Sequence, residues 1–146
     1  MSELKHSTIL LVEDDTTDAE ITLRSFQAGN ITNDFLVAHD GPTALSILKR
    51  EGMYRDGVCP DLVLLDIHLP GMTGLEVLQY IKEDRNLDHV SVIMVTGSER
   101  DEDVIKALDL GAKGYLVKPA NLLQLSEIVS CADNMGLSIV VKPQSE

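Results

Sequence analysis

Short, nearly continuous apolar segments that alternate with helical patterns constrain the fold of this chain more than any other feature. Three of them lack the polar residue at every second position that a half-exposed strand shows, which suits strands covered on both faces. Apolar residues at helical spacing separate them, for example Leu75, Leu78 and Ile81. Five such alternations predict an α/β fold with a parallel sheet, and right-handed crossovers leave few topologies. The expected strands are Thr8–Val12, Asp34–Ala38, Leu62–Leu65, Val90–Val95 and Tyr115–Val117.

The chain length and the distribution of loops indicate one domain. With 146 residues the chain is close to the common size of a single domain, so we expect one core in residues 1–146 and no second module. The longest break between predicted elements is "EGMYRDGVCP", residues 51–60. In the tail, residues 136–146, the apolar "LSIVVKP" predicts either a short additional strand or a packed tail.

The acidic composition excludes several classes of function. The formal net charge is −12, and the basic residues are scattered, with Lys49-Arg50 the nearest to a cluster. We therefore expect no nucleic-acid partner, because phosphate binding needs clustered Lys and Arg. The first apolar stretch has five residues, too few for a signal peptide or a membrane span. Cys59 and Cys131 form no C-x-x-C motif, which argues against a disulfide or metal framework and favours a reduced, cytoplasmic location.

Acidic residues gather where the first and third predicted strands end. "LLVEDDTTD" places Glu13, Asp14 and Asp15 directly after apolar residues, and Asp66 follows "PDLVLL". Acids in such positions are often ordinary residues of a helix first turn, where negative charge is favourable, and we expect this of Asp15 and Asp18. If the first and third strands are neighbours, Glu13, Asp14 and Asp66 converge at the carboxyl edge of the sheet. Converging carboxylates favour a hard divalent cation such as Mg²⁺.

The remaining predicted strand ends supply groups that complement these acids. Thr96 closes "VIMVT" with a hydroxyl, and Gly97 leaves space beside it. Lys118, in "YLVKP", offers a positive charge that suits phosphate. A carboxylate nucleophile, a metal, a hydroxyl and an ammonium are together what phosphoryl transfer to an aspartate requires. A lysine before a proline is also consistent with an ordinary turn, and it is the combination of Lys118 with Asp66 and Thr96 that favours a role in phosphate binding.

In their order and spacing, "VEDD", "LLDIHLPGMTG", "VTG" and "GYLVKP" resemble the receiver domain of response regulators, over about residues 7–135. The resemblance implies a doubly wound, flavodoxin-like (βα)5 fold with a five-stranded parallel sheet in the order 2-1-3-4-5. It implies Asp66 as the phosphoacceptor and Lys118 as a contact of the phosphoryl group, with a cis Lys118–Pro119 peptide bond. Thr96 and Tyr115 would form the switch pair.

The resemblance also implies a set of metal ligands. Glu13, Asp14 and Asp66 would hold Mg²⁺ together with the backbone carbonyl oxygen of His68. The imidazole of His68 is itself a conceivable phosphoacceptor or metal ligand, but we expect it to be a solvent-facing neighbour of the site.

The resemblance implies a two-component signalling protein that takes a phosphoryl group from a histidine kinase and later loses it slowly, a switch more than a metabolic enzyme. The 51–60 loop, "KPANLLQL" and the "IVVKP" tail resemble stand-alone receivers associated with phytochrome-type kinases. About ten residues follow the matched region, so we expect no DNA-binding output domain and an output through protein contacts. A homodimer through the fourth helix (about residues 99–110), the fifth strand and the fifth helix is one such output.

Three alternatives share parts of this pattern. A flavodoxin-like protein binds FMN phosphate after its first strand, where the acids of this chain would repel it. A phosphohydrolase of the haloacid dehalogenase type needs D-x-D, but His68 stands where its second acid belongs. A non-phosphorylated, protein-binding scaffold on the same fold remains open.

Overall fold

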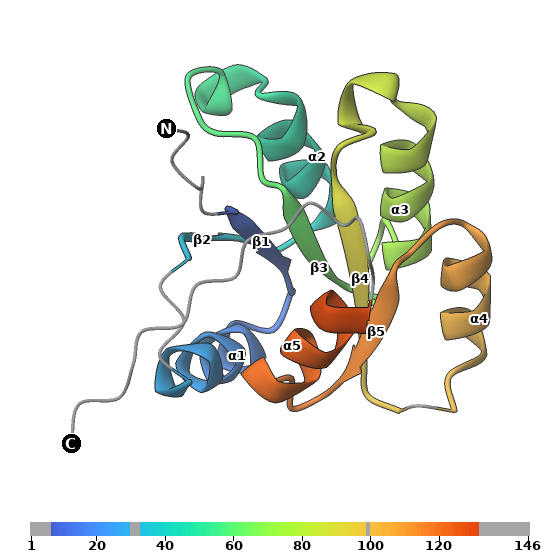
Figure 1. Ribbon diagram of the computed structural model, residues 1–146. Coiled ribbons are helices and arrows are strands. Elements are labelled where there is room, and N and C mark those ends of the chain that lie inside the picture. The colour runs from blue at the N-terminus through green and yellow to red at the C-terminus, as the bar shows by residue number, and fades with distance from the viewer. Residues whose placement is uncertain (1–6, 30–32, 99, 132–146) are drawn as a thin grey trace.

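A computed structural model of the chain describes residues 7–29, 33–98 and 100–131. Within these residues the predicted five-stranded parallel sheet is confirmed, in the strand order β2-β1-β3-β4-β5 (Figure 1). The strands are β1 (Ile9–Val12), β2 (Phe35–Ala38), β3 (Leu62–Asp66), β4 (Ser91–Thr96) and β5 (Gly114–Val117). The prediction of a strand or packed tail after Gly136 lies outside the described residues.

Helices cover both faces of this sheet (Figure 1). They are α1 (Thr16–Ala28), α2 (Gly41–Lys49), α3 (Gly74–Glu83), α4 (Glu102–Asp109) and α5 (Leu122–Cys131), with short 3₁₀ helices η1 (Gly52–Tyr54) and η2 (Arg85–Leu87). Alternate residues of β1 point to opposite faces: Leu10 belongs to a core that includes residues of α2, α3 and α4, whereas Leu11 belongs to a core that includes residues of α1 and α5. Every residue of β1, β3 and β4 is buried, which explains their continuous apolar sequences.

Side-chain caps fix where the helices begin after each strand. Asp15 caps α1, since its Oδ1 accepts the backbone N–H groups of Thr17 at 2.8 Å and Asp18 at 3.0 Å. Asp101 caps α4 in the same way, and this shortens the helix that we predicted for about residues 99–110 to Glu102–Asp109. A capping carboxylate satisfies N–H groups that have no partner within the helix, so the chain turns into a helix directly at the sheet edge.

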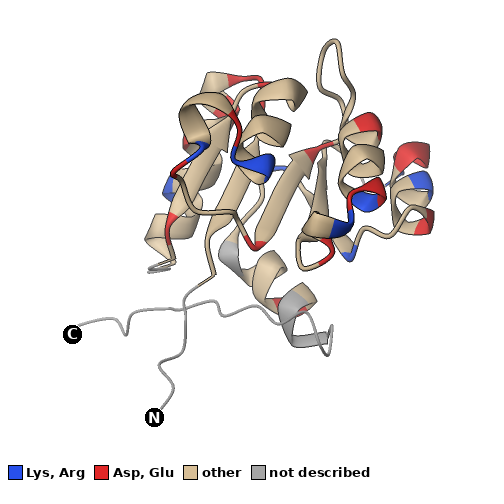
Figure 2. Cartoon of the chain, turned by 90° about the horizontal axis from the view of Figure 1, so that it is seen from above, with Lys and Arg blue, Asp and Glu red and all other residues tan. Residues whose placement is uncertain are grey.

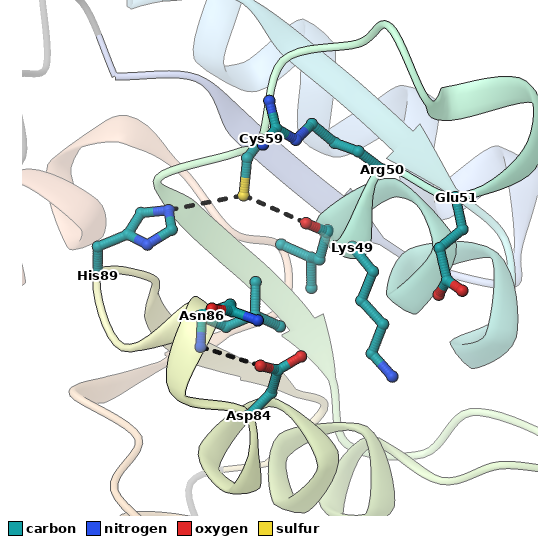
Figure 3. A pocket seen from close by; sticks show the side chains of 9 residues that line it. Lys49, Arg50, Glu51, Cys59, Asp84, Asn86 and His89 are labelled. Carbon is teal, nitrogen blue, oxygen red and sulfur yellow. Dashed lines mark hydrogen bonds between the residues drawn. The ribbon is translucent and has the colours of Figure 1, made fainter.

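The 51–60 loop lies at the opposite, amino end of the strands. It contains η1 and lines a hollow of about 600 Å³ together with the end of α2 and the η2 region (Figure 3). In this hollow the Cys59 thiol donates to the Leu48 carbonyl oxygen at 3.4 Å, and its sulfur lies 3.6 Å from His89 Nε2. The loop is therefore anchored to the fold but lies away from the acids at the carboxyl edge.

The helices carry charges of both signs on their surfaces (Figure 2). Lys and Arg are interspersed with Asp and Glu along these helices. Among the residues that the structure describes, no helix combines the length and the apolar character that crossing a membrane requires.

Candidate functional site

The three acids predicted to converge do so at the carboxyl edge of the sheet. Because β1 and β3 are neighbours, Glu13 and Asp14, which follow β1, lie beside Asp66 at the end of β3. One carboxylate oxygen from each lies within 4.8 Å of the others. Glu13 is 3% exposed and Asp66 is 5% exposed, whereas Asp14 is open to solvent. The pKa of Glu13 is raised to about 7, chiefly by burial. The hydrogen bond from Lys118 lowers this pKa, and the nearby Asp66 carboxylate raises it.

Lys118 supplies the positive charge in this pocket. It follows β5, and its Nζ lies 2.6 Å from Glu13 Oε1 and 3.0 Å from Asp66 Oδ2. Burial by itself lowers the pKa of Lys118, but the two carboxylates outweigh it and raise the pKa above its ordinary value. The predicted cis peptide bond between Lys118 and Pro119 is present. The ammonium group therefore stays charged and holds Asp66 in place.

Thr96 lies at the end of β4 and is fully buried; it pairs with Val117 on β5, and its neighbour Val95 pairs with Asp66 on β3. Its hydroxyl donates toward the Ser98 carbonyl oxygen at 3.0 Å and Asp101 Oδ2 at 3.2 Å, and it accepts the Ser98 N–H at 3.2 Å. The hydroxyl is thus bonded to the loop between β4 and α4. Tyr115, the other predicted switch residue, lies on β5 and is 37% exposed.

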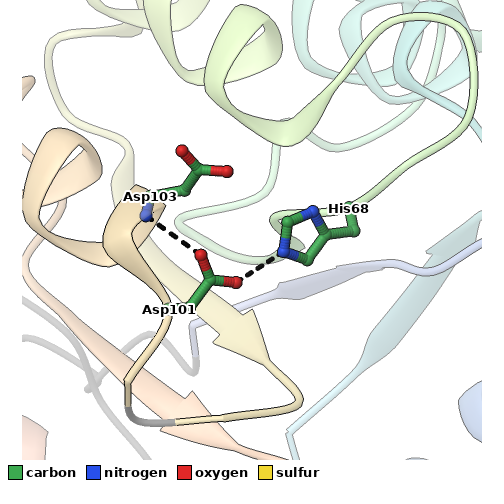
Figure 4. Close-up of side chains that lie close together, drawn as sticks. All are labelled: His68, Asp101 and Asp103. Carbon is green, nitrogen blue, oxygen red and sulfur yellow. Dashed lines mark hydrogen bonds and ion pairs between the residues drawn. The ribbon is translucent and has the colours of Figure 1, made fainter.

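His68 contacts the site through both its backbone and its side chain. Its backbone N–H donates to Asp66 Oδ1 at 3.0 Å, so the two carboxylate oxygens of Asp66 have different partners. The side chain is 62% exposed, as expected of a solvent-facing neighbour, yet its Nε2 donates to Asp101 Oδ2 at 2.5 Å (Figure 4). That its carbonyl oxygen is a metal ligand stays a prediction.

Two acidic residues have contacts that the sequence patterns did not indicate. Asp18 lies in the first turn of α1, as predicted, but its Oδ2 also lies 3.4 Å from Lys118 Nζ. Asp101 contacts both Thr96 and His68. Burial alone would raise the pKa of Asp101, but hydrogen bonds from the Asp103 N–H and from His68 outweigh it and lower the pKa below its ordinary value. The only signal for either was a position near a helix start, which many surface acids share.

The donor atoms in the pocket determine which ion it suits. Among the described residues, two groups bring three candidate ligand atoms within 4.8 Å of one another. Glu13, Asp14 and Asp66 offer carboxylate oxygens alone, the donors that Mg²⁺ prefers, and the exposed Asp14 leaves room for water ligands. The second group, which contains His68, Asp101 and Asp103, is already joined by the hydrogen bond from His68 to Asp101.

Comparison with known proteins identifies the family of this chain. The family model of the response regulator receiver domain matches residues 9–130. Response regulator Rcp1 of Synechocystis is 33% identical over 135 residues, which cover 92% of each chain; a structure of its Mn²⁺-bound form has a TM-score of 0.71 at 33% identity and covers 94% of this chain and 99% of that chain.

Two further solved structures are similar over most of their length. The bacteriophytochrome response regulator AtBRR has a TM-score of 0.80 at 35% identity, covering 97% of this chain and 99% of that chain. The phosphorylated cyanobacterial phytochrome response regulator RcpA has a TM-score of 0.72 at 35% identity, covering 87% of this chain and 91% of that chain. On the family match and these likenesses, the chain belongs to the response regulator receiver domain family of two-component signalling.

Proposed function

We propose that the protein is a response-regulator receiver that accepts a phosphoryl group from a histidine kinase onto Asp66. The observation that carries the proposal is the meeting of Glu13, Asp14 and Lys118 around the buried carboxylate of Asp66. An acid on a sheet edge with no role in chemistry would be solvated or paired once. Here the carboxylate is paired with an ammonium and crowded by two further acids, which favours a charge-carrying reaction over a purely structural role.

Glu13, Asp14, Asp66 and the His68 carbonyl oxygen would hold Mg²⁺. When bound, the ion offsets the negative charge of these carboxylates and of the phosphoryl oxygens. The donor set supports this assignment, as does the similarity to Rcp1, which has been solved with Mn²⁺. Burial is the main cause of the raised pKa of Glu13, and a bound cation would offset the smaller contribution of the Asp66 carboxylate.

In the transfer step a carboxylate oxygen of Asp66 attacks the phosphorus of a phosphohistidine. The P–N bond breaks, a P–O bond to Asp66 forms, and the histidine nitrogen leaves with the electron pair. Lys118 Nζ, already 3.0 Å from Asp66 Oδ2, stabilises the phosphoryl oxygens, and Thr96 donates its hydroxyl to one of them after rotation. Water later hydrolyses the acyl phosphate, so the protein is a resettable switch more than a metabolic enzyme.

The output is proposed to be a protein contact at the surface of α4, β5 and α5. Ile105, Leu108 and Leu110 are exposed on or beside α4, and Tyr115 is exposed on β5. This surface would bind a second copy of the chain or a target protein when Thr96 and Tyr115 change position. The similarity to AtBRR and RcpA supports a kinase of the phytochrome type. The proposed site of the exchange is the cytoplasm.

Labelling with acetyl phosphate and Mg²⁺ tests the central assignment. Intact-protein mass spectrometry should show one added phosphoryl group in the wild type and none in Asp66→Asn. Asp56→Asn, an exposed acid in the 51–60 loop, is the control and should label as the wild type does. Equal labelling of Asp66→Asn would contradict the assignment, and an unlabelled wild type would favour the non-phosphorylated scaffold.

Sedimentation with and without beryllofluoride tests the switched surface. The phosphoryl mimic should tighten self-association or partner binding by about 5- to 150-fold, the range of typical couplings between sites. Thr96→Ala should lose this effect while Asp66 still accepts phosphate. An unchanged mass and affinity in the wild type would leave the protein as a phosphate carrier alone.

A further inference from the structure

We propose that Asp101 is a positioning residue that holds the Thr96 hydroxyl away from Asp66 in the unphosphorylated protein, an inference that rests on the proposed phosphoacceptor role. The Asp101 latch, as we name the side chains of Asp101, Thr96 and His68, joins three elements near the site. These are the end of β4, the loop between β3 and α3, and the start of α4. Figure 4 shows the contacts of Asp101 with His68 and Asp103.

The two oxygens of the Asp101 carboxylate have separate partners. Oδ1 accepts the backbone N–H of Asp103 at 3.0 Å and so caps α4. Oδ2 accepts from Thr96 Oγ1 at 3.2 Å and from His68 Nε2 at 2.5 Å. Hydrogen bonds to an ionised acceptor are stronger than those between neutral groups. One carboxylate therefore fixes the helix start and restrains Thr96.

A threonine hydroxyl has a single proton to donate, and this limits what Thr96 can do. While the proton points toward Asp101 and the Ser98 carbonyl oxygen, it is not available to a phosphoryl oxygen on Asp66. Thr96 is fully buried, so its hydroxyl has no contact with solvent that could replace a lost protein partner. The carboxylate of Asp101 and the phosphoryl group thus compete for the same proton.

The connection to α4 gives this competition a structural consequence. When Thr96 turns to the phosphoryl group, Oδ2 of Asp101 loses one of its two side-chain donors and keeps only His68. The first turn of α4, which Asp101 caps, and the β3–α3 loop that carries His68 are then less tightly coupled to β4. The latch therefore favours the resting conformation. It lowers the apparent affinity for a phosphoryl group, because only molecules in which Thr96 has left Asp101 can donate its hydroxyl to that group.

Asp101→Asn separates the latch from the helix cap. Asparagine is as good an N-cap as aspartate, but it has one acceptor oxygen in place of two. If the asparagine oxygen accepts the Asp103 N–H, the asparagine NH₂ group faces Thr96 and His68. An NH₂ group donates hydrogen bonds and cannot accept one from either residue. Asp101→Ser is a second variant that retains a capping oxygen on a side chain too short to bridge the loops. Asp103→Asn is the matched control, because it removes one charge from the same helix turn and has no contact with Thr96.

Two measurements on the full chain decide the proposal. Three-bond NMR couplings report the χ1 rotamer of Thr96 in the free protein; we expect one rotamer in the wild type and in Asp103→Asn, and averaging in both Asp101 variants. Titration with beryllofluoride and Mg²⁺ should give an apparent affinity about tenfold tighter in the Asp101 variants, in line with the loss of one hydrogen bond to a charged group. Melting temperatures identify any variant that has lost the cap as well.

The outcomes separate this inference from the proposed function. A single Thr96 rotamer in both Asp101 variants, or an unchanged beryllofluoride affinity despite a freed rotamer, would overturn the latch. A wild type that binds no beryllofluoride would overturn the phosphoacceptor role instead. The rotamer measurement does not depend on phosphorylation, so it would still judge whether Asp101 restrains Thr96.

Discussion

Replacing Glu13 by Gln removes a buried carboxylate from the pocket while conserving its shape and its ability to accept from Lys118. Glu13 is 3% exposed and its pKa is raised from 4.5 to about 7, chiefly by burial. Between these values the folded protein holds a proton that the unfolded chain has released. The contribution of Glu13 to stability is therefore complete below about pH 4.5 and is lost as the pH rises through 7.

The size of the effect follows from the pKa difference. One pKa unit corresponds to about 1.4 kcal/mol, so the ionised Glu13 weakens folding by roughly 3 kcal/mol at pH 8 and by less than about 1 kcal/mol at pH 5. Glutamine does not titrate, so the Glu13→Gln protein should gain roughly 2 to 3 kcal/mol over the wild type between pH 5 and pH 8. For a domain of this size that corresponds to a relative rise of roughly 5 to 10 °C in melting temperature.

Urea unfolding at several pH values, in the presence of a chelator, measures this difference directly. Glu51→Gln, an exposed glutamate remote from the pocket, is the control for the chemical change itself. At a Mg²⁺ concentration a hundred times the dissociation constant of the wild type, the ion should stabilise the wild type by about 2.7 kcal/mol. The same concentration should stabilise Glu13→Gln by less, because this variant lacks one of the proposed metal ligands and binds Mg²⁺ more weakly. Stability curves of Glu13→Gln and the wild type that run parallel from pH 5 to pH 8 would refute the reasoning.

The remaining predictions concern the frame around the pocket. Lys118→Met should destabilise the metal-free protein by roughly 2 kcal/mol in urea unfolding, because two buried carboxylates lose their partner. The effect is moderate because the Lys118 side chain is 27% exposed and its ion pairs are partly screened by solvent. An unchanged stability would show that these ion pairs do not stabilise the fold. Gly74→Ala should lower the melting temperature by several degrees and impair labelling of Asp66, because a Cβ would lie 2.2 Å from the Asp66 carbonyl oxygen. Its control is Gly97→Ala, whose Cβ meets nothing within 4 Å, and equal melting of the two variants would contradict the clash. Asp15→Ala should lose about 1 kcal/mol with its helix cap and Asp15→Asn almost none, as measured by thermal unfolding; equal losses would assign the effect to charge.

Much of the fold could be predicted because burial on both faces leaves a local trace. The strands β1, β3 and β4 are apolar at almost every position, and their helices repeat apolar residues at helical spacing. The ends of the elements were less well defined. Asp66 and Thr96 belong to their strands, and α4 begins only after Asp101. The ladder and the cap decide these boundaries, and neither has a strong signal in composition.

The candidate site was predictable as far as it is built from residues at strand ends. Glu13, Asp14 and Asp66 could be brought together on paper once two strands were taken as neighbours, because parallel strands end at one edge. The contacts of Asp18 and Asp101 were not predictable in this way. Lys118 and Asp18 are 100 residues apart, and His68 and Asp101 are 33 apart. Long side chains that meet across loops leave no period in the sequence.

The sequence by itself therefore determined the class of fold, the chemical groups at the sheet edge and, through its resemblance to receiver domains, the strand order. Hydrophobic periodicity and the position of an acid at a strand end are properties of a few neighbouring residues. Only the tertiary structure decided that Lys118 pairs with Glu13 and Asp66, and that Thr96 gives its hydroxyl to the Asp101 loop. Which donor meets which acceptor depends on distances of a few ångströms between separate elements, and packing alone sets those distances.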